Sequence, residues 1–537
     1  MIRKGSSASS PLDDTTTANP GLVEQSPSRV ALLARWRRRF VRWLAVDTRP
    51  RPYAMLWLAL ILFLLSFSIK ALHAVDLSPV MNTANQPGHG MSAEYDRDAL
   101  LKLDGNGVFF PANWDSGDTS LLARAPGYSI FLSAVYSITA NSYFYVQLVQ
   151  NLVNSISPVL IFLISGSLIG WRVGFASGFL AAVSHHLSYH SNLVLPDSLA
   201  ALPILLAVYV LVRARRPRSS RLLACVLAAL LFGAATWLRP NLLLMGPLMA
   251  LIVTFASNRP RQAMRTAWLI ALVPFLVVAP ITVRNYLIFH RLVPISENMG
   301  IVLWEGIGDA GGAGSGAPNS DHLVADQEAV MYGDPRYADS WSSPDGISRD
   351  RDRIRRSVAV ITSHPIWFAG AVAGRMKRML SYVAEADLIQ KNPPAALGPP
   401  AVVFAGSPEK VARREQNAAL QLRASRRTLM FGEAIGWTRP AARFLQRVAK
   451  ETATPFIFLG LFIVSVLAPR RALLLLGIPL YYLVVQSIMH LEFRYTLPMH
   501  YFMFVLAATV WILIARGAWR LAARTASLIR SRLTPDA

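Results

Sequence analysis

About ten apolar stretches long enough to span a membrane divide this chain, which leaves little choice of fold class. A bilayer core offers the backbone no hydrogen-bond partners, so a chain with many such stretches must cross as α-helices. The composition agrees, since 53% of the 537 residues are hydrophobic and only 16% are charged. We therefore predict an all-α polytopic membrane protein with about ten transmembrane helices. The expected spans are 53–73, 144–168, 172–189, 197–212, 222–238, 241–257, 266–283, 454–469, 472–489 and 497–515.

Arginine-rich connectors alternate with arginine-poor ones along the chain. The rich ones are Arg35 to Arg42, Arg213 to Arg221, Arg259 to Arg265, Arg470 with Arg471, and Arg516 to Arg532. By the positive-inside rule they are cytoplasmic, which places both termini inside and the other connectors outside. Much of the formal net charge of +23 lies in these runs, a pattern typical of anchoring to anionic lipids. No nucleic-acid partner is expected.

Two long outer loops interrupt the predicted bundle. A short helix from Pro126 and an amphipathic helix over 364–382 are expected to lie at the membrane interface. As a crossing, 364–382 would upset the charge alternation, because it carries Arg375, Lys377 and Arg378. The predicted organisation is a disordered basic cytoplasmic tail (1–50), a multi-span domain (51–516) with outer loops 74–143 and 284–453, and a basic cytoplasmic tail (517–537).

A few arginines lie on the outer face, where the alternation disfavours them. They are Arg124, Arg239, Arg284, Arg291 and Arg494. Isolated arginines can extend toward lipid headgroups, but several on one face also suit an anionic ligand. A guanidinium binds phosphate through two parallel hydrogen bonds. We therefore predict a phosphate-binding site on this face.

Carboxylates accompany these arginines and provide candidates for a general base. They are Asp76, Glu94, Asp96, Asp98, Asp197 and Glu492. Glu94 belongs to a segment, EYDRDALLKL, with helical spacing of apolar residues. His186 and His190 share a helical face, but no acidic third ligand lies at a recognised offset. No metal site is predicted, and interfacial hydrogen bonding is the expected role of these histidines.

No Walker loop, dinucleotide fingerprint or nucleophile elbow is present in the sequence. An enzyme on the outer face therefore needs an activated substrate that is already there, such as a lipid-linked phosphosugar. The alternative is a transporter or flippase of a lipid-linked or anionic solute, which would place charges at mid-span. A third possibility is a noncatalytic assembly or polymerase-type membrane protein. It would not explain why acids and arginines occur together on the outer face.

The order of motifs resembles the bacterial C-fold glycosyltransferases of family 39, which include protein mannosyltransferases and the aminoarabinose transferases of lipid A. The similarity covers most of residues 50–515. Its motifs are Glu94-Tyr95 with Ala99, RAPGYS, LPDSLA, LRPN, PITVRNYLIFHRLVPIS and EFRYTLP.

The resemblance implies an enzyme that takes a sugar from a polyprenyl-phosphate carrier. The acceptor would be a glycan, lipid or protein at the periplasmic face of the bacterial inner membrane, and membrane lipids would surround the protein. No cofactor is implied, and a divalent metal is left open.

The resemblance also assigns roles to residues. The family base is an Asp a few residues before the Tyr, but here those positions read GHGMSAE. Glu94 is therefore the first candidate base, Asp76 the second and Asp96 the third. The predicted donor phosphate site is Arg124, Arg239, Arg284 and Arg494, and the substrate-orienting residues are Tyr95, Tyr128, Asp197 and Glu492.

Overall fold

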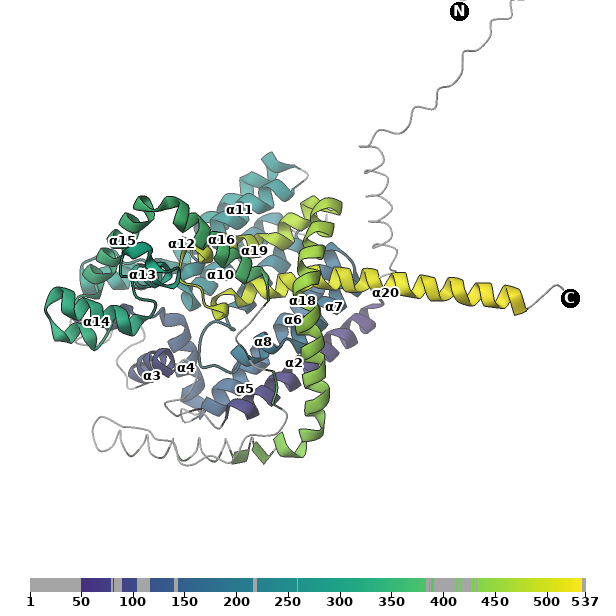
Figure 1. The fold of residues 1–537 in the computed structure, drawn as a ribbon, viewed down its shortest axis with the longest axis horizontal. Helices are drawn as coiled ribbons and strands as arrows, with labels where there is room; N and C mark the ends of the chain where they lie inside the picture. Colours follow the sequence, from purple (N-terminus) through teal and green to yellow (C-terminus); the bar gives the residue numbers. More distant parts are fainter. Residues whose placement is uncertain are drawn as a thin grey trace, which may run out of the picture.

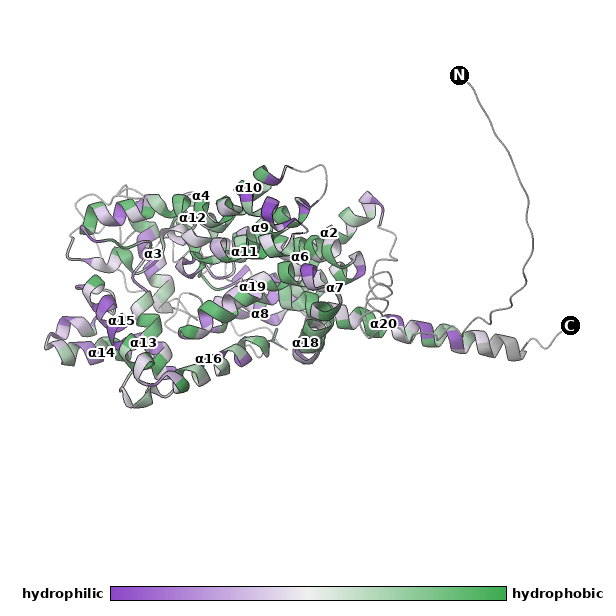
Figure 2. Cartoon of the chain, turned by 90° about the horizontal axis from the view of Figure 1, so that it is seen from above, coloured by the Kyte–Doolittle hydropathy of each residue, from purple (hydrophilic) through white to green (hydrophobic). Residues whose placement is uncertain are grey.

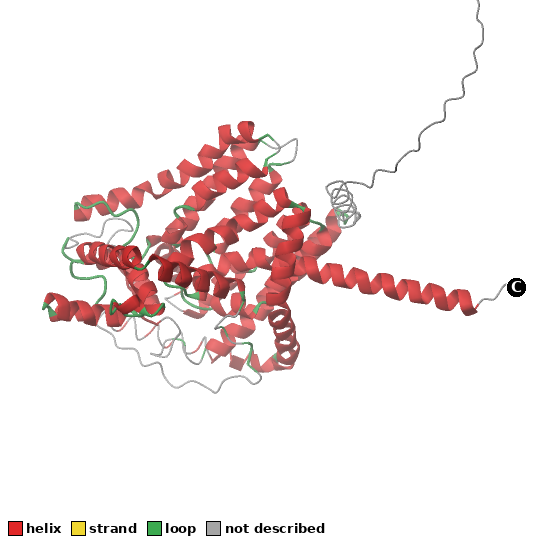
Figure 3. Cartoon of the chain, turned by 45° about the horizontal axis from the view of Figure 1, so that its top comes forward, coloured by secondary structure: helices red, strands yellow, loops and turns green. Residues whose placement is uncertain are grey.

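The computed structural model is built of helices, and none of the residues it describes forms a strand (Figure 3). This confirms the predicted all-α class. The described residues are 50–78, 81, 89–103, 116–139, 143–215, 220–257, 259–382, 386, 388–390, scattered positions between 412 and 430, and 432–533.

Seven helical segments are long and apolar enough to cross a membrane, judged on length and composition. They are α2 (Pro52–Leu77), α5 with α6 (Tyr143–Asn154 and Ile156–Leu168), α10 (Arg221–Leu238), α12 (Pro260–Phe289), α18 (Arg439–Leu467), α19 (Pro469–Ile488) and α20 (Leu497–Leu533). Each coincides with a predicted span.

Three other predicted spans contain shorter apolar helices. They are α7 (Trp171–Val183), α9 (Ala201–Arg213) and α11 (Met245–Ala256). A helix of this length rises about 20 Å, which is less than the roughly 30 Å of a hydrocarbon core. The chain adds irregular or 3₁₀ backbone beside them, such as η2 (Pro240–Leu242) before α11. Seven of the ten predicted spans therefore correspond to segments that are long enough to cross a membrane, and the other three contain only short apolar helices.

The outside of the bundle is apolar, as a lipid-facing surface requires. On α2, Trp57, Ile61 and Leu64 are exposed, and on α12 so are Leu272 and Leu276. Exposed apolar surface of this extent would be costly in water. Figure 2 shows the same apolar colouring over the helices of the bundle, with polar residues returning along the C-terminal part of α20.

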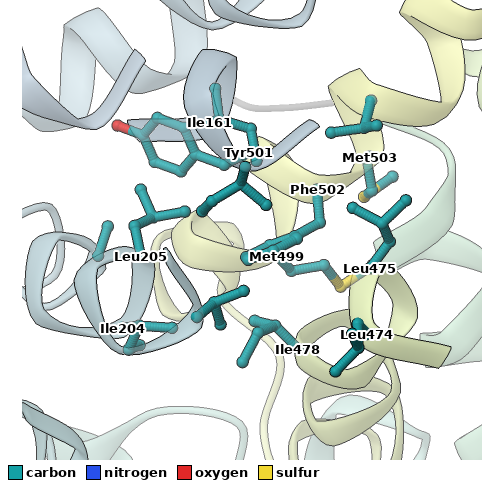
Figure 4. Packing of buried hydrophobic residues seen from close by; sticks show 14 of the residues in the cluster. Ile161, Ile204, Leu205, Leu474, Leu475, Ile478, Met499, Tyr501, Phe502 and Met503 are labelled. Atoms are coloured by element: carbon teal, nitrogen blue, oxygen red, sulfur yellow. The ribbon is translucent and has the colours of Figure 1, made fainter. Parts of the chain in front are cut away.

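The interior of the bundle is built around the first half of α20. This helix packs against α7, α18 and α19. Figure 4 shows Met499, Phe502 and Met503 of α20 among Ile204 and Ile478 of the surrounding helices. Large side chains fill the space between helices here, and this close packing holds the spans in register.

Glycines allow α6 and α7 to approach closely. A Cβ atom at Gly174 would lie 2.6 Å from the carbonyl oxygen of Phe162, and one at Gly178 would lie 2.8 Å from that of Pro158. Small residues commonly let membrane helices pack at short range. The helix pair is therefore fixed by backbone contact as well as by side chains.

The polar helices gather at one end of the molecule. They are α3 (His89–Leu103), α4 (Pro126–Thr139), α13 (Met299–Asp309), α14 (Asp321–Tyr332), α15 (Gly346–Ser363) and α16 (Pro365–Leu380). Figures 1 and 2 show α3, α13, α14 and α15 at this end, while the C-terminal half of α20 extends away at the other. The residues predicted for the two outer loops thus share one face.

A buried acid organises the second outer loop. Glu328 of α14 is fully buried and accepts hydrogen bonds from Arg349 at 2.7 Å, Arg353 at 2.6 Å and Arg356 at 3.1 Å. A buried carboxylate needs such partners, because desolvation of an unpaired charge is costly. The basic run at 349–356 therefore has a structural role in joining α14 to α15.

Several predicted boundaries differ in the structure. Helix α12 continues to Phe289, so Arg284 lies inside a helix and not at the start of a loop. Helix α18 begins at Arg439, within the loop predicted over 284–453, and α20 stays helical to Leu533, through most of the predicted tail. Hydropathy marks the apolar part of each helix, whereas backbone hydrogen bonding continues into the polar flanks. The predicted tail over 1–50 lies outside the described residues except for its last position.

Helix α16 corresponds to the predicted interfacial helix over 364–382. It meets α15 at a bend of 106°, so the two do not form one straight crossing. Its buried Arg375 donates a hydrogen bond to the carbonyl oxygen of Ser487 at 2.9 Å and another to that of Gly306. This arginine therefore ties α16 to both α13 and the end of α19. The interfacial position of α16 stays a prediction.

Candidate functional site

A cavity of about 390 Å³ lies at the polar end of the bundle. Its walls come from α3, the segment before α4, α13, the start of α14, the loop after it, and the segment that joins α19 to α20. The polar or charged lining residues are Glu94, Arg124, Asn298, Glu305, Asn319, Ser320, Asp321, His322, Asp339, Ser340, Trp341, His490, Glu492, Arg494 and Tyr495. Segments separated by hundreds of residues in the sequence therefore share one polar hollow.

An ion pair between Glu94 and Arg124 forms part of one wall. The Glu94 carboxylate accepts a hydrogen bond from Arg124 Nε at 2.5 Å. The Arg124 guanidinium also lies 5.4 Å from the ring centroid of Trp341. These contacts fix the planar group at the cavity surface, where a phosphate could replace the carboxylate as its partner.

Two further arginines flank Tyr495, which lines the cavity. The guanidinium carbons of Arg239 and Arg494 lie 4.4 Å and 5.0 Å from the ring centroid of Tyr495. Arg494 pairs with Glu492, and Arg239 pairs with buried Asp197 at 2.7 Å. Each guanidinium thus has a carboxylate partner and an aromatic face, which orients it without leaving its charge uncompensated.

The opposite wall carries a group of acids around one imidazole. His490 is bonded to Asp309 and lies 3.7 Å from Glu492. Burial would lower the pKa of His490, but the hydrogen bonds to Asp309 and Glu492 outweigh it and raise the pKa to about 10. Burial raises the pKa of neighbouring Glu305 to about 7. Glu305 therefore changes protonation near neutral pH, which suits a group that exchanges protons or binds a substrate hydroxyl.

The position of Arg124 is set by the loop that follows α12. Asn285 donates hydrogen bonds to the carbonyl oxygens of Val293 at 2.8 Å and Ile295 at 3.1 Å. Farther along, the side-chain amide of Asn298 donates to the carbonyl oxygen of Ala123 at 2.9 Å. The VRNY and VPIS motifs therefore form a clamp that holds the residue just before Arg124.

Gly127 in the RAPGYS motif lets α4 meet the end of α10. A Cβ atom there would lie 2.4 Å from the carbonyl oxygen of Trp237, two residues before Arg239. We expect Gly127→Ala to lower the melting temperature, because the start of α4 must move away from the backbone of Trp237. Thermal unfolding of the purified protein measures this effect.

The matched control is Gly370→Ala in α16, where nothing lies within 4 Å of the added Cβ atom. We expect this variant to keep the wild-type melting temperature or exceed it slightly. Equal melting temperatures for Gly127→Ala and the wild type would contradict the close-packing argument.

The structure brings some of the predicted site residues to the cavity and leaves others apart. Glu94, Arg124, Glu492 and Arg494 line it. Arg239, which contacts the ring of Tyr495, and its partner Asp197 do not line the cavity themselves. The remaining predicted residues do not line the cavity; they are Asp76, Asp96, Tyr95, Tyr128 and Arg284.

Each residue outside the cavity has a different partner. Asp76 is buried and accepts hydrogen bonds from Arg439 at 2.5 Å and from the backbone N–H of Gln390 at 2.8 Å. Asp96 accepts a hydrogen bond from Tyr136 at 2.6 Å. Both acids are bonded away from the cavity, so Glu94 is the one of the three candidate bases that lines it.

Tyr95, Tyr128 and Arg284 are buried. The two tyrosine rings pack edge to face at 5.1 Å, and the Tyr128 hydroxyl donates to Gln150. Arg284 donates to the side-chain oxygen of Asn285 at 2.6 Å and so supports the clamp that positions Arg124. None of the three lines the cavity, and the substrate-orienting role of the tyrosines and the phosphate-binding role of Arg284 stay predictions.

Sequence reasoning missed Glu305, Trp341 and Asn298, all from the second outer loop. None of them belongs to a recognisable motif, and no spacing relates them to the first loop. His490 and Tyr495 belong to the HLEFRY segment that did draw attention. Only the folded chain brings these groups together.

Of the two histidines for which interfacial hydrogen bonding was predicted, His186 is buried and His190 is partly buried, and that role stays a prediction. His186 packs edge to face with His190 and His500, with ring centroids 4.6 Å and 4.7 Å apart. Tyr382 packs on the same cluster. Within the described part of the chain, no group of three His, Cys, Asp or Glu side chains is arranged to hold a metal ion.

Part of the chain that contains several of the site residues matches a known protein family. Residues 123–283 match the sequence model of the family described as dolichyl-phosphate-mannose-protein mannosyltransferase. This match confirms the predicted resemblance to a C-fold membrane glycosyltransferase. It includes Arg124, Asp197 and Arg239, while Glu94, Glu305 and Arg494 lie outside it. No curated protein sequence matches the chain significantly.

Solved structures of an archaeal oligosaccharyltransferase from Archaeoglobus fulgidus are also similar. One, a complex with zinc and sulfate, has 12% identity and a TM-score of 0.42, over 87% of this chain and 51% of that chain. Another, in complex with an inhibitory peptide and a dolichol-phosphate, has 12% identity and a TM-score of 0.40, over 86% and 52%. This chain therefore spans about half the length of those proteins.

Proposed function

We propose that the chain transfers a sugar from a polyprenyl-phosphate carrier to an acceptor in the cavity at the polar end of the bundle. The observation that carries this proposal is the Glu94–Arg124 pair in a cavity that Arg494 also lines. A phosphate site and a carboxylate base are the two groups that such a transfer requires. The matched family, whose description names a dolichyl-phosphate sugar donor, supports the donor class.

The ion pair suggests how donor binding prepares the base. When the donor phosphate binds Arg124, it replaces the Glu94 carboxylate as the partner of the guanidinium. Glu94 then loses its stabilising charge and becomes a stronger base. Glu94 therefore becomes a strong base only after the sugar donor has bound.

The transfer itself forms one bond and breaks another. The acceptor oxygen or nitrogen attacks the anomeric carbon, and its proton passes to Glu94. The bond from that carbon to the phosphate oxygen breaks, and the electron pair leaves with the lipid phosphate. Arg124 and Arg494 stabilise the charge that develops there, and Arg239 supports Arg494 through Tyr495.

The acidic wall provides a place for the acceptor. Glu305, Asp321 and Glu492 can accept hydrogen bonds from hydroxyl or amino groups. The second outer loop supplies most of this wall and would cover the bound sugar, as a lid that excludes water. We place this face on the periplasmic side of a bacterial inner membrane, following the arginine alternation.

The direct test is sugar transfer by the purified chain reconstituted in liposomes. We expect labelled sugar to move from polyprenyl phosphate to an acceptor fraction, and Glu94→Gln to lower the rate by about 10²–10⁴-fold, since it removes the proton acceptor. Asp96→Asn is the matched control in the same helix and is expected to stay within about threefold of the wild type, because residue 96 does not line the cavity and an asparagine oxygen can still accept the hydrogen bond from Tyr136. Transfer by Glu94→Gln at the wild-type rate would refute this assignment of the base.

A further inference from the structure

A second cavity, of about 460 Å³, lies at the arginine-rich end of the bundle. It is bounded by the ends of α9, α10, α11 and α12 and by Leu474 of α19. It shares no lining residue with the candidate active site. The mechanism proposed above gives it no role.

Positive charge collects around this cavity without acidic compensation. Arg215, Arg221 and Arg259 line it, and none of its lining residues is Asp or Glu. The connectors 213–221 and 257–265 contain no acid in their sequence either. Partial burial and the neighbouring charge of Arg471 lower the pKa of Arg215, which shows that the cations crowd one another.

Two helices direct their N-termini at the same place. Helix α10 begins at Arg221, and α12 begins at Pro260, directly after Arg259. The side chain of Ser220 accepts a hydrogen bond from one backbone N–H at the start of α10, that of Leu223, whereas no side chain caps the start of α12. The first turns of a helix carry free N–H groups and the positive end of the helix dipole, which favour an anion.

The remaining wall combines three uncharged polar residues, Ser257, Gln262 and Thr266, with apolar side chains that continue into the lipid-facing surface. Leu211, Val253 and Leu474 line the cavity. Beside it, Leu223 of α10 and Phe255 of α11 are exposed at 67% and 68%. A ligand that fits must therefore combine a negatively charged group with an apolar part, and it must be able to enter from the bilayer.

We propose that this cavity binds the phosphate headgroup of an anionic phospholipid. The three arginines and the two helix N-termini hold the phosphodiester, and the first methylenes of the acyl chains pack against the leucine and valine side chains. Basic pockets between membrane helices are suited to such lipids. The bound lipid would join α10 and α12 at the end of the bundle opposite the active site.

The test measures lipid binding to the full-length purified chain in detergent by native mass spectrometry. We expect phosphatidylglycerol to bind more tightly than phosphatidylcholine. In a variant that combines Arg221→Gln with Arg259→Gln, the dissociation constant for phosphatidylglycerol should rise about 30-fold, as removal of two surface arginines predicts. All of these side chains are exposed, so the fold should persist, and thermal unfolding checks this.

A matched control removes the same charge from the same face. Arg261 and Arg265 are exposed residues at the start of α12 that do not line the cavity. The double variant Arg261→Gln with Arg265→Gln should change the dissociation constant by less than about threefold, because these exposed side chains do not line the cavity and their charges are partly screened by salt. Equal weakening in both double variants, or equal binding of phosphatidylcholine, would overturn the proposal. Binding of inorganic phosphate as tight as that of phosphatidylglycerol would indicate a free-anion site and would overturn the lipid assignment.

Discussion

Replacement of Arg124 by alanine is expected to lower kcat/KM for sugar transfer by about 10²–10³-fold, as loss of a single oxyanion-stabilising group typically does. The reason is that Arg124 has two tasks in the proposed reaction. It stabilises charge on the departing phosphate, and its release of Glu94 upon donor binding creates the base. Initial rates at varied donor concentration measure the effect.

Two variants distinguish a specific role of the Arg124 guanidinium from a general effect of positive charge. Arg124→Lys keeps the charge but loses the planar pair of N–H donors, so we expect it to recover only part of the activity. Arg291→Ala removes an exposed arginine from the same end of the bundle and should leave kcat/KM nearly unchanged. If Arg291→Ala lowered kcat/KM as much as Arg124→Ala, the effect would be one of long-range charge alone.

An acidic limb in the pH profile, along which kcat/KM rises with pH, is the second large effect that we expect. Because the pKa of Glu305 is raised to about 7, kcat/KM should rise up to tenfold per pH unit below neutrality and level off above it, if ionised Glu305 binds the acceptor. Glu305→Gln should lower kcat/KM and abolish this limb. The pH profile of both proteins between pH 5 and pH 9 is the measurement, a range of about four units around the raised pKa.

The neighbours of Glu305 determine how the profile is interpreted. The pKa of His490 is raised to about 10 and that of Glu492 is lowered to about 2, so neither titrates in this range. His322 also lines the cavity and is titratable, so His322→Asn is the control and should keep the limb. A limb that persists in Glu305→Gln and vanishes in His322→Asn would assign the titration to the histidine.

The raised pKa of Glu305 also affects stability. The folded protein holds this proton at a pH where the unfolded chain has released it, between about 4.5 and 7. The contribution of Glu305 to the free energy of unfolding is therefore greatest at low pH and falls as the pH rises through this window. The ionised form of Glu305, which the proposed activity needs, is therefore the form in which this residue contributes least to the free energy of unfolding.

Much of the bundle was predictable because hydropathy is a local property. The stretch 222–238 is apolar enough to demand a helix in a bilayer whatever surrounds it, and α10 occupies Arg221–Leu238. The ends of the short helices were harder to predict. Helix α7 ends at Val183, while its predicted span continued to 189, because the backbone leaves the helical conformation at Ser184, whose side chain caps the separate short helix α8 (His185–His190).

The site was predictable only in part. Arg124 and Arg494 were singled out because they break the charge alternation, and both line the cavity. Asp76 was also singled out, as an acid on the same predicted face. It is nevertheless paired with Arg439, from a helix more than 360 residues later. No sequence spacing could have revealed that partner, because the contact depends on how α2 and α18 pack.

The sequence by itself determined which segments are long and apolar enough to cross a membrane and which connectors are rich in arginine, while the side that each connector faces stays a prediction. These follow from transfer free energies and charge placement, which each segment carries independently of the others. The tertiary structure alone decided that Glu94 is paired with Arg124, that Glu305 and His490 form the opposite wall, and that three arginines enclose a second cavity. Such choices depend on long-range packing, in which the second outer loop and the segment before α20 close over residues from the first loop.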